Sequence, residues 1–279
     1  MPYFKHNETD VYFDLYGSGP DLLFMHGLAA DRRQGQQALD GLTGYRLIVV
    51  DMPGHGDSKL SPAHSLNDQV SFKAYVTVVD ALTTHLGIES VIAGGISMGA
   101  GIALGLALAR PDLVRALLLV RPAWLDRPAR PHLGVIEDIG NWIAEAGTEA
   151  AAERLLEHPV YAAAVAENPT CAASIMGAID RPQAVESAAV LSAMVADQPF
   201  SRMGVLRKCA IPALVVGNNA DPLHPAMIAR EISGALADAS YFHAPPKYLE
   251  PLEHQVAVVK TIGQFLAQRL VATRALPTD

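Results

Sequence analysis

Cysteine is scarce in this sequence. The 279-residue chain holds only Cys171 and Cys209, which are too few for a disulfide framework or a zinc cluster. We therefore expect two thiols in a reducing compartment. The first ten residues are polar and lack the apolar core of a secretory signal. Together these absences predict a cytoplasmic protein.

Basic residues are also fewer than acidic ones. The chain has 21 Lys and Arg against 29 Asp and Glu, which gives a net charge of −8 at pH 7. An acidic protein repels a phosphate backbone. Nucleic acid is therefore not an expected partner.

Charged residues are few overall, at 18%, whereas hydrophobic residues make up 50%. This balance excludes intrinsic disorder, because the chain has ample apolar surface for a core. One uncharged stretch, residues 91–109, is long enough for a membrane helix. Five glycines interrupt it, so we interpret it as a buried strand, a sharp turn and a buried helix. No membrane association is expected.

Short apolar runs alternate with helical patterns over most of the chain. After an N-terminal hairpin, runs typical of strands occur at residues 21–25, 45–50, 90–94, 114–120, 213–216 and 240–243. Continuous apolar strands alternating with helices predict an α/β fold with a mostly parallel sheet covered on both faces.

The pattern changes in the middle of the chain. Between residues 122 and 207 the strand-like runs disappear, and helical segments rich in Ala, Glu and Leu follow one another, separated by prolines and glycine. We interpret residues 122–207 as a helical lid. It is inserted into a core made of residues 1–121 and 208–279.

Residues 95–99 read Gly-Ile-Ser-Met-Gly, a G-x-S-x-G pattern. An apolar strand precedes the pattern and a helix follows it. This is the setting of a nucleophile elbow, in which a sharp strand-to-helix turn lifts the serine hydroxyl above the sheet. Ser97 is therefore the candidate nucleophile.

Four further features follow in order along the chain. His26-Gly27 closes an early strand, residues 51–58 (DMPGHGDS) follow the next, Asp221-Pro222 follows a late strand, and His254 lies beyond the last. With the elbow, they make nearly the whole sequence resemble the α/β-hydrolase superfamily, and especially its lid-bearing esterases, lactonases and carbon–carbon bond hydrolases. The resemblance implies a sheet of about eight strands flanked by helices, with the lid after the sixth strand.

The resemblance also implies a catalytic triad. Ser97 would attack the substrate, His254 would take its proton, and Asp221 would orient the histidine. Of the ten histidines, His254 alone follows the last expected strand, although Glu253 precedes it where the family usually has glycine. Asp126, after an earlier strand, is the alternative acid.

The oxyanion formed during attack needs backbone N–H donors. The resemblance places them at Leu28 and Met98, and it leaves His26 a structural role. No cluster of ligands at metal spacing surrounds Asp51, so no metal is expected. The Gly54–Gly56 pair lacks the helix start and acidic residue of a dinucleotide fingerprint, so no cofactor is expected either.

The pocket is expected to be apolar and partly lined by the lid. Trp124 is the residue of the lid that we most expect to line it. Arg121, at the end of a strand, is a candidate for holding a substrate carboxylate by paired hydrogen bonds. Arg32 and Arg33 are further candidates for this role. The competing interpretation is that these arginines are solvated or ion-paired on loop surfaces.

These features predict an enzyme that cleaves a small carboxylic ester or lactone through an acyl-enzyme at Ser97. Two alternatives use the same triad: a carbon–carbon bond hydrolase and an acyltransferase. A third is a non-catalytic ligand receptor built on the hydrolase fold, because a fold does not by itself specify a reaction.

Overall fold

The computed structural model describes residues 2–272, with side chains described up to residue 269. Within this range the chain forms one eight-stranded sheet with the strand order β1-β2-β4-β3-β5-β6-β7-β8. The strands are β1 (Tyr3–His6), β2 (Thr9–Gly17), β3 (Asp21–Met25), β4 (Arg46–Val50), β5 (Val91–Ile96), β6 (Val114–Val120), β7 (Ala213–Asn218) and β8 (Ala239–Ala244).

Only the N-terminal edge of the sheet is antiparallel. β1 and β2 form a hairpin, and β2 pairs antiparallel with β4. The hairpin turn, Asn7-Glu8, has positive φ at both residues (45° and 61°), as a two-residue turn of type I′ requires. Every other neighbouring pair, from β4 to β8, is parallel. The carboxyl ends of β3, β5, β6 and β7 therefore meet at one edge, where sites in such sheets form.

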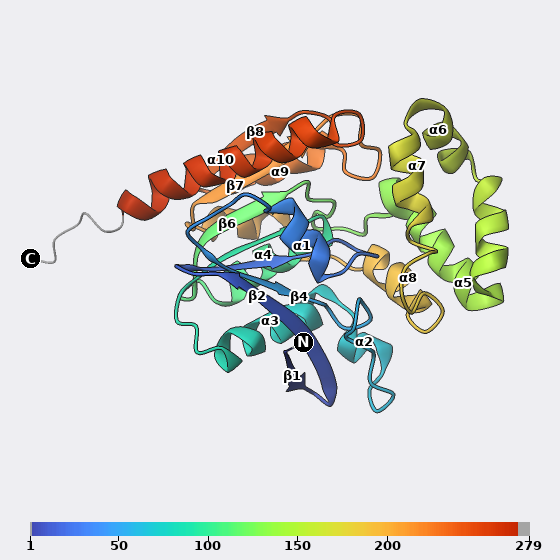
Figure 1. Cartoon of the computed structure of the whole chain (residues 1–279), viewed down its shortest axis with the longest axis horizontal. Helices are drawn as coiled ribbons and strands as arrows, with labels where there is room; N and C mark the ends of the chain where they lie inside the picture. Colours follow the sequence, from blue (N-terminus) through green and yellow to red (C-terminus); the bar gives the residue numbers. More distant parts are fainter. Residues whose placement is uncertain (1, 273–279) are drawn as a thin grey trace, which may run out of the picture.

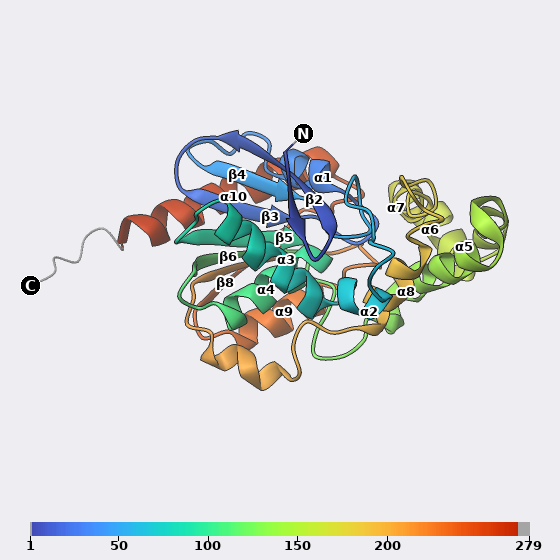
Figure 2. The same ribbon diagram turned by 90° about the horizontal axis from the view of Figure 1, so that it is seen from below.

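Helices cover both faces of the sheet (Figure 2). One face packs against α3 (Phe72–His85), α4 (Met98–Ala109) and α9 (Ala226–Ala235), and the other packs against α1 (Arg32–Ala38) and α10 (Pro251–Ala272). The strand sequences explain this, because alternate side chains point to opposite faces. In β3, Leu23 and Met25 belong to the first core, whereas Leu22 and Phe24 belong to the second.

A helical insertion separates β6 from β7. Its helices form a group at one end of the molecule (Figure 1). They are α5 (Arg130–Leu156), α6 (Pro159–Glu167), α7 (Pro169–Met176) and α8 (Ala188–Ala196). The short 3₁₀ helix η1 (Met203–Lys208) follows them in the chain and packs against α9 of the core. The remaining helix, α2 (Leu66–Gln69), lies in the core before α3.

Side chains of the insertion bind the core backbone directly, and one of them, Asp197 Oδ2, accepts from the N–H of Phe72 over 2.7 Å. Asn168 Nδ2 donates to the carbonyl of Ala220 over 3.3 Å, and Gln183 Nε2 donates to the carbonyl of Gly56 over 2.5 Å. The predicted mostly parallel sheet flanked by helices is confirmed. None of the described helices is long and apolar enough to cross a membrane, which agrees with the interpretation of residues 91–109 as a strand, a turn and a helix.

Candidate active site

Ser97 lies between β5 and α4 in a strained backbone conformation, with φ 56° and ψ −111°. Such a conformation is rare for a residue with a Cβ and persists only where the surroundings enforce it. Here the Ser97 N–H donates to the carbonyl of Val120 over 3.0 Å, which fixes the turn to the end of β6. The predicted strand–turn–helix context of the serine is present.

The two glycines of the elbow are required by space. A Cβ on Gly95 would lie 2.5 Å from the carbonyl carbon of Gly99, and a Cβ on Gly99 would lie 2.2 Å from the carbonyl oxygen of Met25. Both distances are shorter than any normal van der Waals contact. The G-x-S-x-G pattern therefore reflects the close packing of α4 against β5 and β3.

Two backbone N–H groups beside the serine are free. Leu28 follows Gly27, and a Cβ built on Gly27 would lie only 3.4 Å from Ser97 Cβ. Met98 begins α4, where the first N–H groups have no partner within the helix. Among the described residues, neither the Leu28 nor the Met98 N–H has a protein acceptor. This is what an oxyanion hole needs, and the assignment stays a prediction.

The loop that carries Leu28 is held by a buried ionic cluster. Asp51 accepts from the backbone N–H of Arg32 over 2.7 Å and from the N–H of Asp57 over 2.8 Å, and its carboxylate pairs with the Arg32 guanidinium. The ring of His26 bridges the same loops, with Nδ1 2.8 Å from the carbonyl of Gly27 and Nε2 accepting from Met52 N–H over 3.1 Å. His26 therefore has the expected structural role.

Asp221 follows β7 and is fully buried between two basic groups. Its Oδ1 lies 2.9 Å from Nδ1 of His224, and its Oδ2 accepts from Nη1 of Arg121 over 3.0 Å. Burial acts to raise the pKa of Asp221, but the His224 ring and the Arg121 guanidinium outweigh it and hold the pKa well below its usual range. The carboxylate is therefore ionised near neutral pH.

His224 is the histidine that shares a cavity with Ser97. The cavity has a volume of about 80 Å³ and is partly roofed by Leu133, Ile136, Ser174 and Ala178 of the insertion. The N–H of His224 donates to the Asp221 carbonyl over 3.2 Å, so the turn brings its ring back onto the carboxylate. Burial lowers the pKa of His224 below its ordinary value, although Asp221 opposes the shift. The ring is therefore neutral, as a general base must be.

His254, the base predicted from the sequence, lies outside the lining of the Ser97 cavity. It is on the first turn of α10, its Nδ1 is 2.7 Å from the carbonyl of Pro245, and it lines a second cavity that Ser97 does not reach. No hydrogen bond among the described residues joins it to Ser97 or Asp221. Burial lowers the pKa of His254 to about 4. The placement follows from α10, which begins at Pro251 and turns the ring toward its own preceding loop.

The loop after β8 brings other residues to the Ser97 cavity, namely Lys247 and Tyr248. The Tyr248 hydroxyl donates to Ser174 Oγ over 3.3 Å, which joins this loop to α7. Burial raises the pKa of Tyr248 to about 12, so the phenol is neutral. Lys247 Nζ lies 4.5 Å from the Tyr248 ring centroid.

Two further candidate residues lie outside the Ser97 cavity. Trp124 is almost fully buried, donates from Nε1 to the Met194 carbonyl over 3.1 Å and contacts Phe72, so it is a core residue and not a pocket residue. Asp126 accepts from the Met203 N–H over 2.9 Å and lies outside the cavity lining, so it is not an alternative acid.

The three candidate arginines differ in their surroundings. Arg32 is buried in ion pairs with Asp14, Asp51 and Asp57, and exposed Arg33 pairs with Asp31. Neither lines the Ser97 cavity, whereas Arg121 does.

Sequence reasoning missed His224, Lys247 and Tyr248. The signal for His224 was its spacing, because a residue three positions after an aspartate can fold back onto it in a tight turn. Lys247 and Tyr248 lie in the loop between β8 and α10 and carry no motif. No group of three or more potential metal ligands gathers within the described residues.

Comparison with known proteins agrees with this fold. Residues 20–248 match the family model of the alpha/beta hydrolase fold. A mouse sn-1-specific diacylglycerol lipase is 32% identical over 118 residues, 41% of this chain and 36% of the relative. A pimeloyl-[acyl-carrier protein] methyl ester esterase of Vibrio campbellii is 30% identical over 128 residues, 46% of each chain. The chain thus spans less than half the length of these curated relatives.

Solved structures match over almost the whole chain at lower identity. An esterase from Thermogutta terrifontis superposes with a TM-score of 0.72 at 22% identity, covering 93% of this chain and 94% of that one. An enol-lactonase from Burkholderia xenovorans superposes with a TM-score of 0.68 at 21% identity, covering 95% and 100%. These likenesses show the fold, and together with the family model they show that this chain belongs to the alpha/beta hydrolase family.

Proposed function

We propose that this protein is a serine hydrolase that cleaves small carboxylic esters or lactones at Ser97, with His224 as the base and Asp221 as its orienting acid. One observation carries the proposal: the strained Ser97 shares a cavity with the ring of His224, and that ring is paired with a buried, ionised Asp221. The relatives named above include esterases and a lactonase, which is consistent with this reaction class.

The proposed reaction follows acyl transfer through a serine. Ser97 Oγ attacks the carbonyl carbon while its proton passes to Nε2 of His224. A proton on Nδ1, facing Asp221, leaves Nε2 free to accept it. The oxyanion is met by the N–H groups of Leu28 and Met98. The alcohol leaves with the proton from Nε2, and water then hydrolyses the acyl-enzyme by the same steps.

Ser97 Oγ has no hydrogen bond to a histidine among the described residues. Catalytic hydrogen bonds are often long in the absence of substrate and tighten only in the complex. The proposal therefore requires the His224 and Ser97 side chains to come within hydrogen-bond distance when substrate fills the small cavity between them.

Labelling with a fluorophosphonate tests the proposal, because the reagent reacts with an activated serine. Mass spectrometry of the labelled peptide should place the adduct on Ser97. Ser97→Ala should abolish both labelling and hydrolysis of p-nitrophenyl acetate. Ser174→Ala is the matched control, since Ser174 lines the same cavity and should leave labelling at Ser97. An adduct elsewhere, or activity within tenfold of wild type in Ser97→Ala, contradicts the proposal.

A non-catalytic ligand-binding protein is the second candidate. It is favoured by the loop after β8, which reaches the Ser97 cavity with a tyrosine rather than a histidine. In that case the fluorophosphonate should fail to label wild type, and p-nitrophenyl octanoate should bind without turnover. Comparing acetate and octanoate esters also reports how long an acyl chain the cavity accepts.

A further inference from the structure

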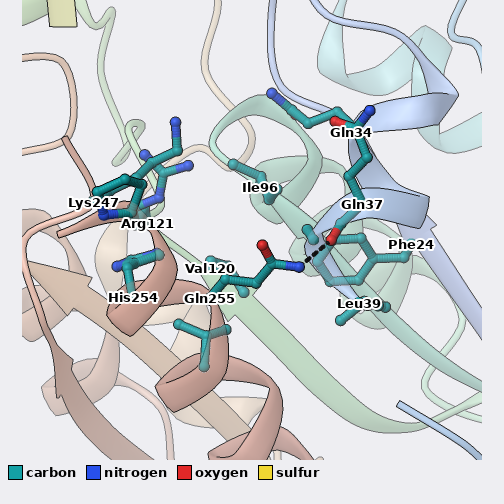
Figure 3. A pocket seen from close by; sticks show the side chains of 13 residues that line it. Phe24, Gln34, Gln37, Leu39, Ile96, Val120, Arg121, Lys247, His254 and Gln255 are labelled. Atoms are coloured by element: carbon teal, nitrogen blue, oxygen red, sulfur yellow. Dashed lines mark hydrogen bonds between the residues drawn. The ribbon is translucent and has the colours of Figure 1, made fainter. Parts of the chain in front are cut away.

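A second cavity lies beside the Ser97 cavity, between α1, α10 and the carboxyl edge of the sheet. Its volume is about 280 Å³. This is just under the lower end of the roughly 300–1,000 Å³ typical of ligand pockets, so the cavity suits a small ligand. Figure 3 shows its side chains, with cationic groups on one wall and apolar groups and amides on the other. The apolar part is formed by Phe24, Ala38, Leu39, Ile96, Val120 and Val258.

The two cavities share part of their lining. Gln34, Ile96, Arg121 and Lys247 line both, whereas Ser97 and His224 line only the smaller one and His254 lines only the larger one. The two cavities therefore adjoin, and Arg121 and Lys247 face both of them. What distinguishes the second cavity is its apolar lining.

The cationic wall carries more positive than negative charge. Arg121 and Lys247 are both cations, and among the described residues Asp221 is the only carboxylate that pairs with either. Lys247 has no carboxylate within ion-pair distance in this part of the chain. Within residues 2–269, Nη1 of the Arg121 guanidinium is the only one of its nitrogens with a protein acceptor, and Nε is buried without one. His254, held by Pro245, is neutral near pH 7.

Burying this excess of positive charge is energetically unfavourable. A half-buried ammonium beside a guanidinium is destabilised by desolvation and by like-charge repulsion, and an anion removes both penalties. Consistent with this, burial and Arg121 lower the pKa of Lys247 to about 8. A neutral ligand would leave Lys247 without a counter-charge, whereas Arg121 keeps its ion pair with Asp221.

We propose that the second cavity binds a small apolar carboxylate, with its carboxylate on Arg121 and Lys247 and its hydrocarbon chain against Phe24, Leu39 and Val258. The apolar lining selects a hydrocarbon chain, and the volume limits its length. The site does not depend on hydrolysis at Ser97 and holds whether or not that reaction occurs.

Calorimetry with hexanoate tests the site, with hexanamide as its neutral match. Ser97→Ala protein is used, so that the serine chemistry plays no part. Hexanoate should bind, and hexanamide should bind at least tenfold more weakly. In the same background, Lys247→Gln should weaken hexanoate binding at least tenfold. Lys260→Gln is the matched control, because it removes one positive charge from an exposed position of α10 and should leave the affinity within twofold.

A second variant locates the ligand. Val258→Phe should fill the cavity from α10 and abolish hexanoate binding, with circular dichroism and thermal melting confirming that it folds. Binding that survives Val258→Phe would place the carboxylate in the Ser97 cavity and overturn the proposal. Equal affinity for hexanamide, no loss in Lys247→Gln, or no hexanoate binding at all would overturn it as well. None of these outcomes bears on fluorophosphonate labelling of Ser97.

Discussion

His224 and Asp221 lie three residues apart in one turn, with Nδ1 of the ring 2.9 Å from Oδ1 of the carboxylate. The proposed base and its orienting acid thus come from a single loop after β7. Their geometry does not depend on how α10 docks. His254, by contrast, is bound by the Pro245 carbonyl in its own loop.

The two histidines give the first prediction. His224→Ala should lower kcat for p-nitrophenyl acetate by at least 10³-fold, because general-base activation of the serine is lost. His254→Ala should change kcat less than threefold. The measurement is steady-state kinetics on both purified variants, with melting temperatures as a check on folding. The reverse order of the two effects would return the base to α10.

The two aspartates give the second prediction. Asp221→Asn should lower kcat by about 10⁴-fold, the size of effect seen when an orienting carboxylate is replaced in a serine triad. Asp126→Asn should stay within threefold of wild type, because Asp126 holds the Met203 N–H outside the cavity. Equal losses in the two variants would mean that Asp221 serves the fold and not the reaction.

Much of the fold could be predicted from sequence because the relevant forces are local. The apolar alternation in β3 divides Leu22 from Leu23 between two cores, and the close approach of α4 to β5 demands glycine at positions 95 and 99. Both are visible as patterns of a few residues. Ser97, the proposed nucleophile, is marked by the same kind of local pattern.

The proposed base could not be predicted from the sequence, because its position depends on how loops close in space. Position along the chain favours His254, but the start of α10 at Pro251 turns that ring toward Pro245. His224 is brought to Ser97 by a turn, which sequence spacing permits without requiring it. Trp124 follows the same logic: its position after β6 suggested the pocket, and packing against Phe72 placed it in the core.

The elbow glycine gives a prediction about stability. Gly99→Ala should lower the free energy of unfolding by roughly 1–3 kcal/mol, because the new methyl group meets the Met25 carbonyl at 2.2 Å and the backbone must shift. Gly134→Ala is the control, since its Cβ would meet nothing within 4 Å and it lies within α5. Alanine there should raise stability by about 0.5–1 kcal/mol. Urea unfolding measures both. An unchanged free energy of unfolding in Gly99→Ala would show that the elbow backbone can shift without a cost in stability.

The buried ion pairs of Asp221 give a prediction about acid. The pKa of Asp221 is held below its usual range in the folded state, so the unfolded chain binds its proton first as the pH falls. Its contribution to stability is therefore full above an unfolded pKa of about 3.9 and is lost as the pH drops further. Asp221→Asn should lose less stability than wild type between pH 5 and pH 3. Urea unfolding at fixed pH values tests this. If the free energies of unfolding of wild type and Asp221→Asn fell equally between pH 5 and pH 3, the prediction would be contradicted.

The last prediction concerns the pH dependence of carboxylate binding in the second cavity. The pKa of Lys247 is lowered to about 8, whereas a carboxylic acid is ionised throughout the range above pH 6. Affinity for hexanoate should therefore be constant between pH 6 and pH 7.5 and should fall above pH 8, as the ammonium loses its proton. Other titratable or charged groups act on Lys247 or lie beside it: Arg121, Cys171, Asp221, His224, Tyr248 and His254.

Titration of those neighbours does not produce a fall in hexanoate affinity near pH 8. Above pH 7, where the affinity is expected to fall, Asp221 is ionised and the two histidines are neutral, and burial raises the pKa of Cys171 to about 11 and that of Tyr248 to about 12. Lys247→Arg provides the decisive comparison, because a guanidinium keeps its proton well above pH 9. Calorimetry should show that this variant holds hexanoate with nearly constant affinity up to pH 9.5. The same loss above pH 8 in wild type and in Lys247→Arg would show that Lys247 does not hold the carboxylate.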